Sequence, residues 1–230
     1  MRRRSLSKLW YLTFPLALLW VVGCNKQQLD KDGGYIDQRT NRYIYVRPSH
    51  LPPSGYKNAN RRLRPNEPQM ISAKVGRIDK DLKSVWLAFE DRQSYQMLAS
   101  DLTAENRDDR EKRLRVQLKF VSPLASVAEK KFKQTWADYT TQVLETQLLN
   151  RQVFAEAHYQ KESKQIFGYL FQKALDKDGK ETDRNLNRWM IEQGLSYFYF
   201  EDATPEEIKD YSAAQALAKE HGAGLWKYQQ

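Results

Sequence analysis

The junction between a strand and a helix is a common place for catalytic groups, and this chain has one near its centre at residues 113–126. Its sequence, RLRVQLKFVSPLAS, first alternates basic or polar residues with apolar ones, which is typical of a strand with one buried face. Pro123 ends this strand, and Ser126 with Glu129 has the spacing of a capping box that begins a helix. The turn between them (VSPL) contains one serine and no acid or base. The junction therefore lacks the groups that acid–base or metal-assisted catalysis needs.

Other residues with catalytic or metal-binding side chains are too scattered to form a site. The three histidines, His50, His158 and His221, lie too far apart in the sequence to predict a metal centre or a catalytic triad. Residues 176–179 (DKDG) resemble the beginning of a calcium loop, but the third ligand and the closing glutamate are absent at the required spacing. A simple turn is the better interpretation. The sequence thus predicts no metal site and no catalytic residue there.

Basic residues on the polar face of the central strand are the best candidates for binding. Arg113, Arg115 and Lys119 alternate with its apolar residues, and Arg77 of an earlier strand is a candidate neighbour. Such a face can follow a phosphate backbone, as the surfaces of OB-type barrels do. The alternative is an ordinary solvated strand face. Because these side chains point away from the core, reversing their charge is expected to leave the fold intact.

The first 23 residues are predicted to be a lipoprotein signal peptide. A basic beginning precedes an apolar stretch at residues 9–22, which is short for a membrane span. The stretch ends in VVGC, which resembles a lipobox and predicts a lipid on Cys24. An ordinary secretory signal or an N-terminal anchor is the alternative. Cys24 is the chain's single cysteine, so the soluble part should contain neither disulfides nor cysteine metal sites. Asn25 resembles signals that favour the outer membrane, facing the periplasm, over the inner membrane.

Charge and composition leave several partners open. The whole chain carries 38 − 29 = +9, and residues 1–23 contain four of these positive charges, which leaves about +5 for the mature protein. That value permits binding to nucleic acid, to anionic lipid or to another anionic polymer of the envelope. Residues 24–69 are polar and contain several prolines, so we interpret them as a tether. Three arginines near its end (61, 62 and 64) could contact lipid headgroups or simply be solvated.

Residues 70–230 are predicted to form one mixed α and β domain. Period-2 patterns and turn residues predict strands at 71–78, 84–90, 113–121, 152–159 and 166–171. Helices are predicted at 127–145, at 184–193 with Gly194 at its C-terminal cap, and at 204–220 after a capping box. Residues 91–112 look like an elaborated loop or a short helix. An aromatic stripe on the first helix is expected to lie in the core; it consists of Phe132, Trp136, Tyr139 and Val143.

Several short motifs in the second half of the chain resemble the staphylococcal nuclease (thermonuclease) family. They are Asn187-x-x-Met190-Ile191-x-x-Gly194-Leu195, Tyr211-x-x-Ala214, Ala218-Lys219 and Gly224-Leu225-Trp226, with Gly168–Phe171 upstream and Asp79-Lys80-Asp81 at the place of the family's Asp-Gly-Asp turn. The resemblance covers roughly residues 71–226. It implies an α+β fold, a five-stranded OB-type β-barrel with three helices.

The same resemblance implies a calcium-dependent phosphodiesterase site, and this chain departs from that site at most positions. The family's catalytic glutamate falls on Leu124, its second metal-binding aspartate on Val121 and its first arginine on Val116, next to Arg115. The second arginine falls near Gln165, and only the early aspartate has a match, Asp81. One carboxylate cannot form a six- to eight-oxygen calcium site alone. The resemblance therefore implies a degenerate active site that uses no metal or other cofactor.

Three classes of function remain open from the sequence. The first is a non-catalytic, membrane-anchored, nuclease-like protein that binds nucleic acid, another anionic polymer or a protein partner in the cell envelope. The second is an active calcium-dependent nuclease with a rearranged site. The third is a purely structural envelope lipoprotein whose partner is another protein.

Overall fold

The structure is a computed structural model that describes residues 62–65, 67–175, 179 and 181–228, with the backbone of two short strands before them. These two strands, β1 (Gly34–Asp37) and β2 (Arg42–Tyr45), pair antiparallel as a separate sheet. The predicted signal peptide, Cys24 and the calcium-loop-like residues before Gly179 lie outside the described residues. Among the described helices, none is long and apolar enough to cross a membrane.

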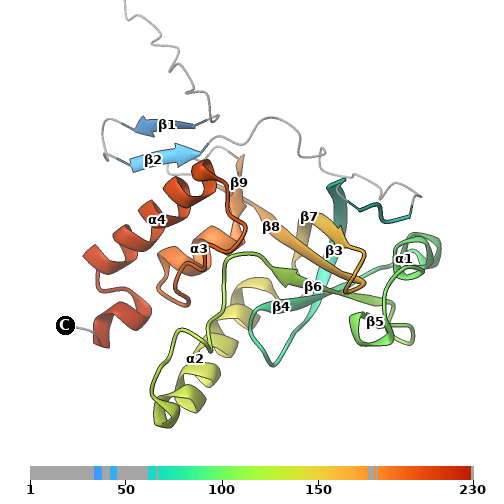
Figure 1. The fold of residues 1–230 in the computed structure, drawn as a ribbon, viewed down its shortest axis with the longest axis horizontal. Coiled ribbons are helices and arrows are strands. Elements are labelled where there is room, and N and C mark those ends of the chain that lie inside the picture. The colour runs from blue at the N-terminus through green and yellow to red at the C-terminus, as the bar shows by residue number, and fades with distance from the viewer. Residues whose placement is uncertain are drawn as a thin grey trace, which may run out of the picture.

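Five strands close into a barrel (Figure 1). They are β3 (Gln69–Ile78), β4 (Ser84–Ala88), β6 (Arg113–Leu118), β7 (Gln152–Gln160) and β8 (Gln165–Leu175). Neighbours pair antiparallel in the order β6-β4-β3-β7-β8, and a parallel pairing of β6 with β8 closes the ring. Two short strands, β5 (Arg107–Asp108) and β9 (Glu181–Asn185), extend the sheet at its ends. The expected α+β fold with a five-stranded OB-type barrel is confirmed.

Alternating burial on β6 shows why this sequence forms a barrel strand. Leu114, Val116 and Leu118 are at most 2% exposed, while the residues between them are only partly buried. Val85 and Leu87 of β4 fill the same core from the neighbouring strand. The side chain of Trp86 points the other way and is nevertheless only 7% exposed. The outer face of the barrel is therefore covered near Trp86.

Four α-helices surround the barrel: α1 (Arg92–Ala99), α2 (Lys130–Leu148), α3 (Leu186–Glu192) and α4 (Pro205–Glu220). The last three are the expected helices, and α1 is a short additional helix in the segment predicted to be a loop or helix. Two 3-10 turns follow α1 and α4, at Ala104–Asn106 and Gly224–Tyr228. Helices α3 and α4 pack against each other, and α2 contacts β3 (Figure 1).

The ends of the last two helices follow the sequence signals. Thr204 and Glu207 form the predicted capping box at the start of α4, with both reciprocal hydrogen bonds present. Asn185 caps α3 by accepting a hydrogen bond from the Arg188 N–H. Gly194 follows α3 with φ +63°, and a Cβ there would lie 2.1 Å from the Ala223 carbonyl oxygen. Only glycine fits that position.

The predicted capping box at the start of α2 is wrong. The helix begins at Lys130, and Glu129 occupies the N-cap without a side-chain cap hydrogen bond. Ser126 instead donates its hydroxyl to the Ser122 carbonyl oxygen and accepts a hydrogen bond from the Tyr197 N–H. A serine–glutamate spacing is local information, whereas this serine bonds to a segment about 70 residues later in the chain, at 2.8 Å.

The aromatic stripe predicted for the core is also partly wrong. Helix α2 buries Trp136, Thr140, Leu144 and Leu148, which follow one another at intervals of four residues. Phe132 is 52% exposed and Tyr139 46% exposed. Trp136 is the member of the predicted stripe that is fully buried, since Val143 is only partly buried against the core.

The last described residues of the predicted tether pack on the domain. Leu63 is 5% exposed and belongs to the hydrophobic core. Pro65 forms a β-bridge with Tyr159, and the Gln69 side chain donates a 2.7 Å hydrogen bond to the Arg62 carbonyl oxygen. Residues 62–65 are therefore part of the folded unit, although they precede the predicted boundary.

Candidate functional site

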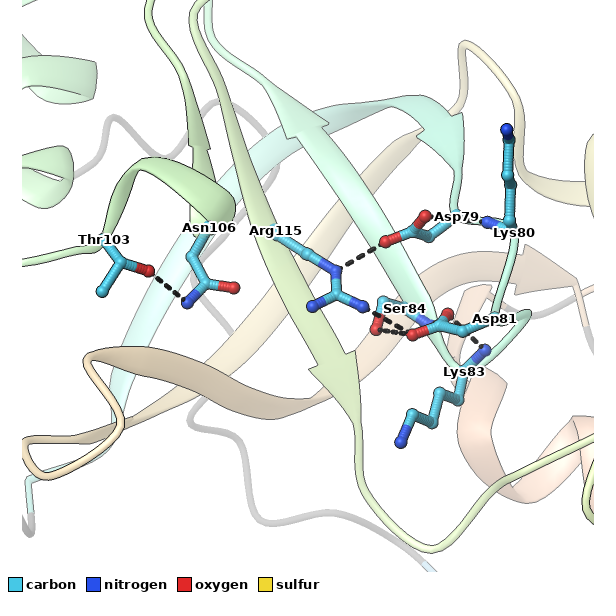
Figure 2. Close-up of polar contacts among 8 residues, drawn as sticks. All are labelled: Asp79, Lys80, Asp81, Lys83, Ser84, Thr103, Asn106 and Arg115. Atoms are coloured by element: carbon cyan, nitrogen blue, oxygen red, sulfur yellow. Dashed lines mark hydrogen bonds and ion pairs between the residues drawn. The ribbon is translucent and has the colours of Figure 1, made fainter.

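The turn between β3 and β4 contains the two aspartates that the family resemblance singled out (Figure 2). The Asp81 carboxylate accepts hydrogen bonds from the N–H groups of Lys83 and Ser84 at 3.0 and 2.9 Å. Its second oxygen accepts the Ser84 hydroxyl at 2.9 Å. The turn closes through the Asp79 N–H, which donates to the Ser84 carbonyl oxygen at 3.0 Å. Asp81 thus already satisfies the backbone of its own turn.

Arg115 of β6 neutralises both aspartates. Its Nε donates to Asp79 Oδ2 at 2.5 Å, and its second guanidinium nitrogen donates to Asp81 Oδ2 at 2.6 Å (Figure 2). The three side chains are 23–25% exposed. Charge-assisted hydrogen bonds of this kind are short and geometrically specific. Arg115 therefore acts as the counter-ion of the turn, and its charge is largely used there.

Arg77, Trp86 and Arg115 form a row on the outer face of β3, β4 and β6. The strand registers pair Arg77 with Trp86 and Trp86 with Arg115. The Arg77 guanidinium lies 4.3 Å from the centre of the Trp86 ring, a cation–π contact. Arg113 lies beside this row, because a Cβ added at Gly76 would come within 2.8 Å of its Nε. We call Arg77, Arg113 and Arg115 the arginine face.

The arginine face is less available to a phosphate than the sequence suggested. Arg113 pairs with Glu111 at 3.5 Å, and Arg115 pairs with two aspartates. Replacing Arg115 by glutamate would place a third carboxylate beside Asp79 and Asp81. The expectation that charge reversal at Arg113, Arg115 and Lys119 leaves the fold intact therefore needs correction at Arg115.

Lys119, the fourth predicted basic residue, lies apart from the arginine face. Its ammonium group is 5.0 Å from the ring centres of both Phe120 and Tyr169. It also lines a cleft of about 400 Å³ at the end of the barrel, where β6 and β7 end and β8 begins. The structure thus brings three of the four predicted residues together and separates the fourth from them.

The cleft combines aromatic and charged side chains. Phe167 and Tyr199 contribute aromatic surface, and Lys83 and Lys119 contribute positive charge. Glu201 and Asp202 also line it, so the charges of these four residues balance. Nucleic-acid-binding grooves usually have a positive excess along the backbone path. The balanced charge of this cleft differs from that pattern.

Asn187 positions the wall of the cleft, a role that sequence periodicity could not predict. It is fully buried, and its amide nitrogen donates to the carbonyl oxygens of Lys119 and Gly168, both at 3.0 Å. Its amide oxygen accepts the Leu170 N–H at 3.0 Å. One side chain on α3 therefore ties the end of β6 to β8. The only sequence signal for it was its place in the family-like motif.

The turn after β6 is held by backbone hydrogen bonds and apolar packing. The Ser122 N–H donates to the Ser196 hydroxyl at 2.8 Å, and the Tyr199 N–H donates to the Phe120 carbonyl oxygen at 3.1 Å. Val121 is 4% exposed and forms a β-bridge with Phe198. Phe120 has a positive φ of 67°, which redirects the chain before Pro123.

These residues do not fit a calcium ion. Val121 and Leu124, which the resemblance places at the family's aspartate and glutamate, have no side-chain oxygen, and Val116 is fully buried in the barrel. Asp79 and Asp81 are engaged by Arg115 and the turn. Within the described residues, no three histidine, cysteine or acidic side chains gather closely enough to hold a metal. Calcium needs six to eight oxygen ligands.

The described histidines do not form a catalytic triad. His158 lies 3.2 Å from a Glu156 carboxylate oxygen and packs edge-on against the Tyr169 ring. Its partners are thus structural neighbours on β7 and β8, with no nucleophile between them. His221 ends α4 at the C-cap. His50 lies outside the described residues.

Comparisons with known proteins give a family match over the second half of the chain. A family model described as "Staphylococcal nuclease homologue" matches residues 115–228, from Arg115 of β6 to the last described residue. Among solved structures, the chain is similar to the extended Tudor domain of Drosophila melanogaster Tudor-SN (p100). That similarity has a TM-score of 0.36 and 15% identity, and it covers 77% of this chain and 80% of that chain. No curated protein matches this chain.

Proposed function

Because residues 115–228 are a staphylococcal nuclease-like domain, we propose that this chain is an envelope lipoprotein whose domain binds single-stranded nucleic acid or a similar anionic polymer without hydrolysing it. The observation that carries the proposal is the pairing of Arg115 with Asp79 and Asp81. It places an arginine against both aspartates of the turn that resembles the family's metal-binding turn. The turn after β6 supplies no acid to replace them.

The expected loss of activity is large. A metal ligand set, a base for the attacking water and a stabiliser of the developing charge are all missing together. Removal of one such group typically slows a reaction by about 10²-fold or more. The alternative of an active calcium-dependent nuclease would need a second set of carboxylates, and the described residues contain no such cluster.

Binding is supported by the cleft. Lys83 and Lys119 can each contact a phosphate, while Phe167 and Tyr199 offer aromatic surface against which bases can stack. Stacking tolerates any base, so the binding should show little sequence preference. Glu201 and Asp202 oppose the two lysines, which makes the affinity modest and strongly dependent on salt.

The anchor is the second part of the proposal. Lipid on Cys24 would hold the domain at a membrane. Asn25, which follows the cysteine, resembles sorting signals that favour the periplasmic side of the outer membrane. Labelling cells with a fatty-acid analogue should mark the protein. Replacing Cys24 by serine should abolish the mark, and a mark that survives this change would contradict the anchor.

The decisive experiment measures cleavage and binding on the same purified protein. We expect no cleavage of DNA or RNA with or without calcium. Fluorescence anisotropy should detect weak binding of single-stranded DNA. A Lys83→Gln, Lys119→Gln variant should bind more weakly, and its plot of log affinity against log salt should be shallower by roughly 0.7 per lost phosphate contact. Lys227→Gln, an exposed lysine after α4, is the matched control and should change little.

Two results would overturn the proposal. Calcium-dependent cleavage that disappears in an Asp81→Asn variant would show an active nuclease with a rearranged site. Absence of DNA binding at low salt would favour a protein partner instead. One observation supports that second candidate: Phe200, beside the acidic rim residues Glu201 and Asp202, is 68% exposed.

A further inference from the structure

The beginning of α2 carries an exposed group of basic and aromatic side chains. Lys130, Lys131, Phe132 and Lys133 are consecutive and all exposed. Tyr139 lies seven residues after Phe132, so the two aromatic residues share a face of the helix. They are 52% and 46% exposed. We call these five residues the α2 patch.

The residues of the α2 patch contribute little to the core. The helix packs through Trp136, Thr140, Leu144 and Leu148, while the patch residues stay exposed. Tyr139 also contacts the buried Trp136 ring, with 5.3 Å between the ring centres. Lysines in a first helical turn oppose the helix dipole, which favours acidic residues there, and the first turn of α2 contains none. Glu129 pairs with Lys131 at 3.1 Å and offsets one of the three charges. The patch thus combines exposed aromatic surface with unfavourably placed positive charge.

We propose that the α2 patch docks on the surface of an anionic lipid bilayer. Each lysine near such a surface strengthens binding by about fivefold. Phenylalanine can bury its ring at the boundary between headgroups and acyl chains, and tyrosine can do so while its hydroxyl contacts water. The Lys131 ammonium lies 4.8 Å from the centre of the Phe132 ring, so charge and aromatic surface are adjacent.

We favour a bilayer as the partner of the α2 patch because the proposed lipid on Cys24 would keep the domain close to the membrane, at a high effective concentration. The inference rests on the proposed function in this respect alone. The chain between Cys24 and Arg62 contains the β1–β2 hairpin, and its other residues could span on the order of 80 Å when extended, which is enough to let any face of the domain reach the membrane. Docking of α2 would then fix which face of the barrel the membrane-bound protein presents.

The test measures how close α2 comes to lipid in the full-length protein. A polarity-sensitive dye is attached to a cysteine at Thr135, an exposed residue beside Phe132, and the chain is mixed with vesicles. One set of vesicles is phosphatidylcholine and the other contains phosphatidylglycerol, and both carry a nitroxide-labelled lipid as quencher. The control is the same dye at Gln96, an exposed residue of α1, which lies away from α2 (Figure 1). The parent chain is treated with dye in parallel to report labelling of Cys24.

We expect quenching and a blue shift of the dye at position 135 with phosphatidylglycerol vesicles, and neither change at position 96. A Lys130→Gln, Lys131→Gln, Lys133→Gln variant should reduce quenching at position 135 to the level seen at position 96. Phe132→Ser should reduce it partly. Circular dichroism of these variants should stay unchanged, because the replaced side chains are exposed.

Equal quenching at positions 135 and 96 would overturn the inference. Quenching at position 135 that is the same with and without phosphatidylglycerol would also overturn it. Displacement of α2 from the vesicles by single-stranded DNA, with the DNA crosslinking to α2, would identify a nucleic-acid site instead and would also overturn it. Flotation with neutral vesicles tests the lipid anchor separately. A chain that does not float with neutral vesicles contradicts the lipid anchor. The dependence of quenching at position 135 on phosphatidylglycerol still tests whether the α2 patch docks on the bilayer.

Discussion

Two arginines in this domain are each held between two carboxylates, in very different surroundings. Arg115 joins a barrel strand to Asp79 and Asp81 of the β3–β4 turn. Arg188 of α3 pairs with Glu192 on its own helix and with Asp210 of α4, the latter at 2.9 Å. Asp210 belongs to the buried residues, whereas Asp79 and Asp81 are about a quarter exposed. The first cluster lies at a turn between two barrel strands, and the second lies between packed helices.

The two clusters differ in how deeply their carboxylates are buried and in what the arginine does there. Burial raises the pKa of Asp210 above its ordinary value even though Arg188 opposes the shift, so this carboxylate depends strongly on its partner. Arg115 satisfies two carboxylates that would otherwise be available to a cation. We infer that the ion pairs of the helical interface contribute mainly to stability, while Arg115 mainly balances charge at the β3–β4 turn.

The largest effect is expected for Arg188→Met. This change leaves Asp210 and Glu192 as carboxylates without their counter-ion in a mostly buried interface, and breaking such a pair typically costs about 3–5 kcal/mol. We expect the free energy of unfolding, measured with denaturant, to fall by about 3 kcal/mol. An Arg188→Met, Asp210→Leu variant should recover part of the loss. A single variant within 1 kcal/mol of the parent, about the effect of an exposed pair, would contradict the comparison.

A smaller effect is expected for Arg115→Gln. The three side chains are partly solvated, so we expect the free energy of unfolding to fall by about 1–2 kcal/mol, mainly from lost charge-assisted hydrogen bonds. Calcium should not restore the thermal stability of this variant, because two carboxylates cannot complete a calcium shell. The comparison requires that calcium leave the melting temperature unchanged. A rise of several degrees with millimolar calcium would show that Arg115 masks a cation site.

The positions of these two arginines explain how far sequence reasoning reaches. The alternation of β6 predicted that Arg115 lies on the outer face of the strand. The aspartates that it contacts are 34 and 36 residues away in the sequence, and no local pattern encodes that contact. Thr204 and Glu207 were predictable as a cap because both belong to the same turn. The exposure of Phe132 was not predictable. It lies four residues before Trp136, in the same series as the buried Thr140, and periodicity does not tell where along α2 the packing begins. Features set by neighbouring residues, such as the cap, were predictable, and contacts between residues far apart in the sequence were not.

Thr204→Ala tests the helical interface without removing an ion pair. Its hydroxyl accepts the Glu207 N–H, and the Glu207 carboxylate accepts the Thr204 N–H, so the change removes one side of a capping box. Loss of such a cap costs about 1 kcal/mol. If Arg188 depends on the position of α4, a Thr204→Ala, Arg188→Met variant should lose less than the sum of the single losses. Strict additivity in chemical denaturation would show that the cap and the ion pair act independently.

The smallest effect is expected for the exposed pair between Lys74 and Glu90, which gives the baseline for both clusters. Its atoms lie 2.7 Å apart, but the side chains are 51% and 83% exposed, so water screens the attraction. The hydrogen bond from Lys74, and then its charge, lowers the pKa of Glu90 below 4.5. A lowered carboxyl pKa stabilises the fold above the unfolded pKa, and that contribution disappears as the pH falls through the folded pKa. In Lys74→Met the pKa of Glu90, followed by NMR, should rise toward 4.5, and stability at neutral pH should fall by less than in Arg115→Gln because the pair is exposed. A loss as large as that of Arg115→Gln would mean that exposure does not distinguish these pairs.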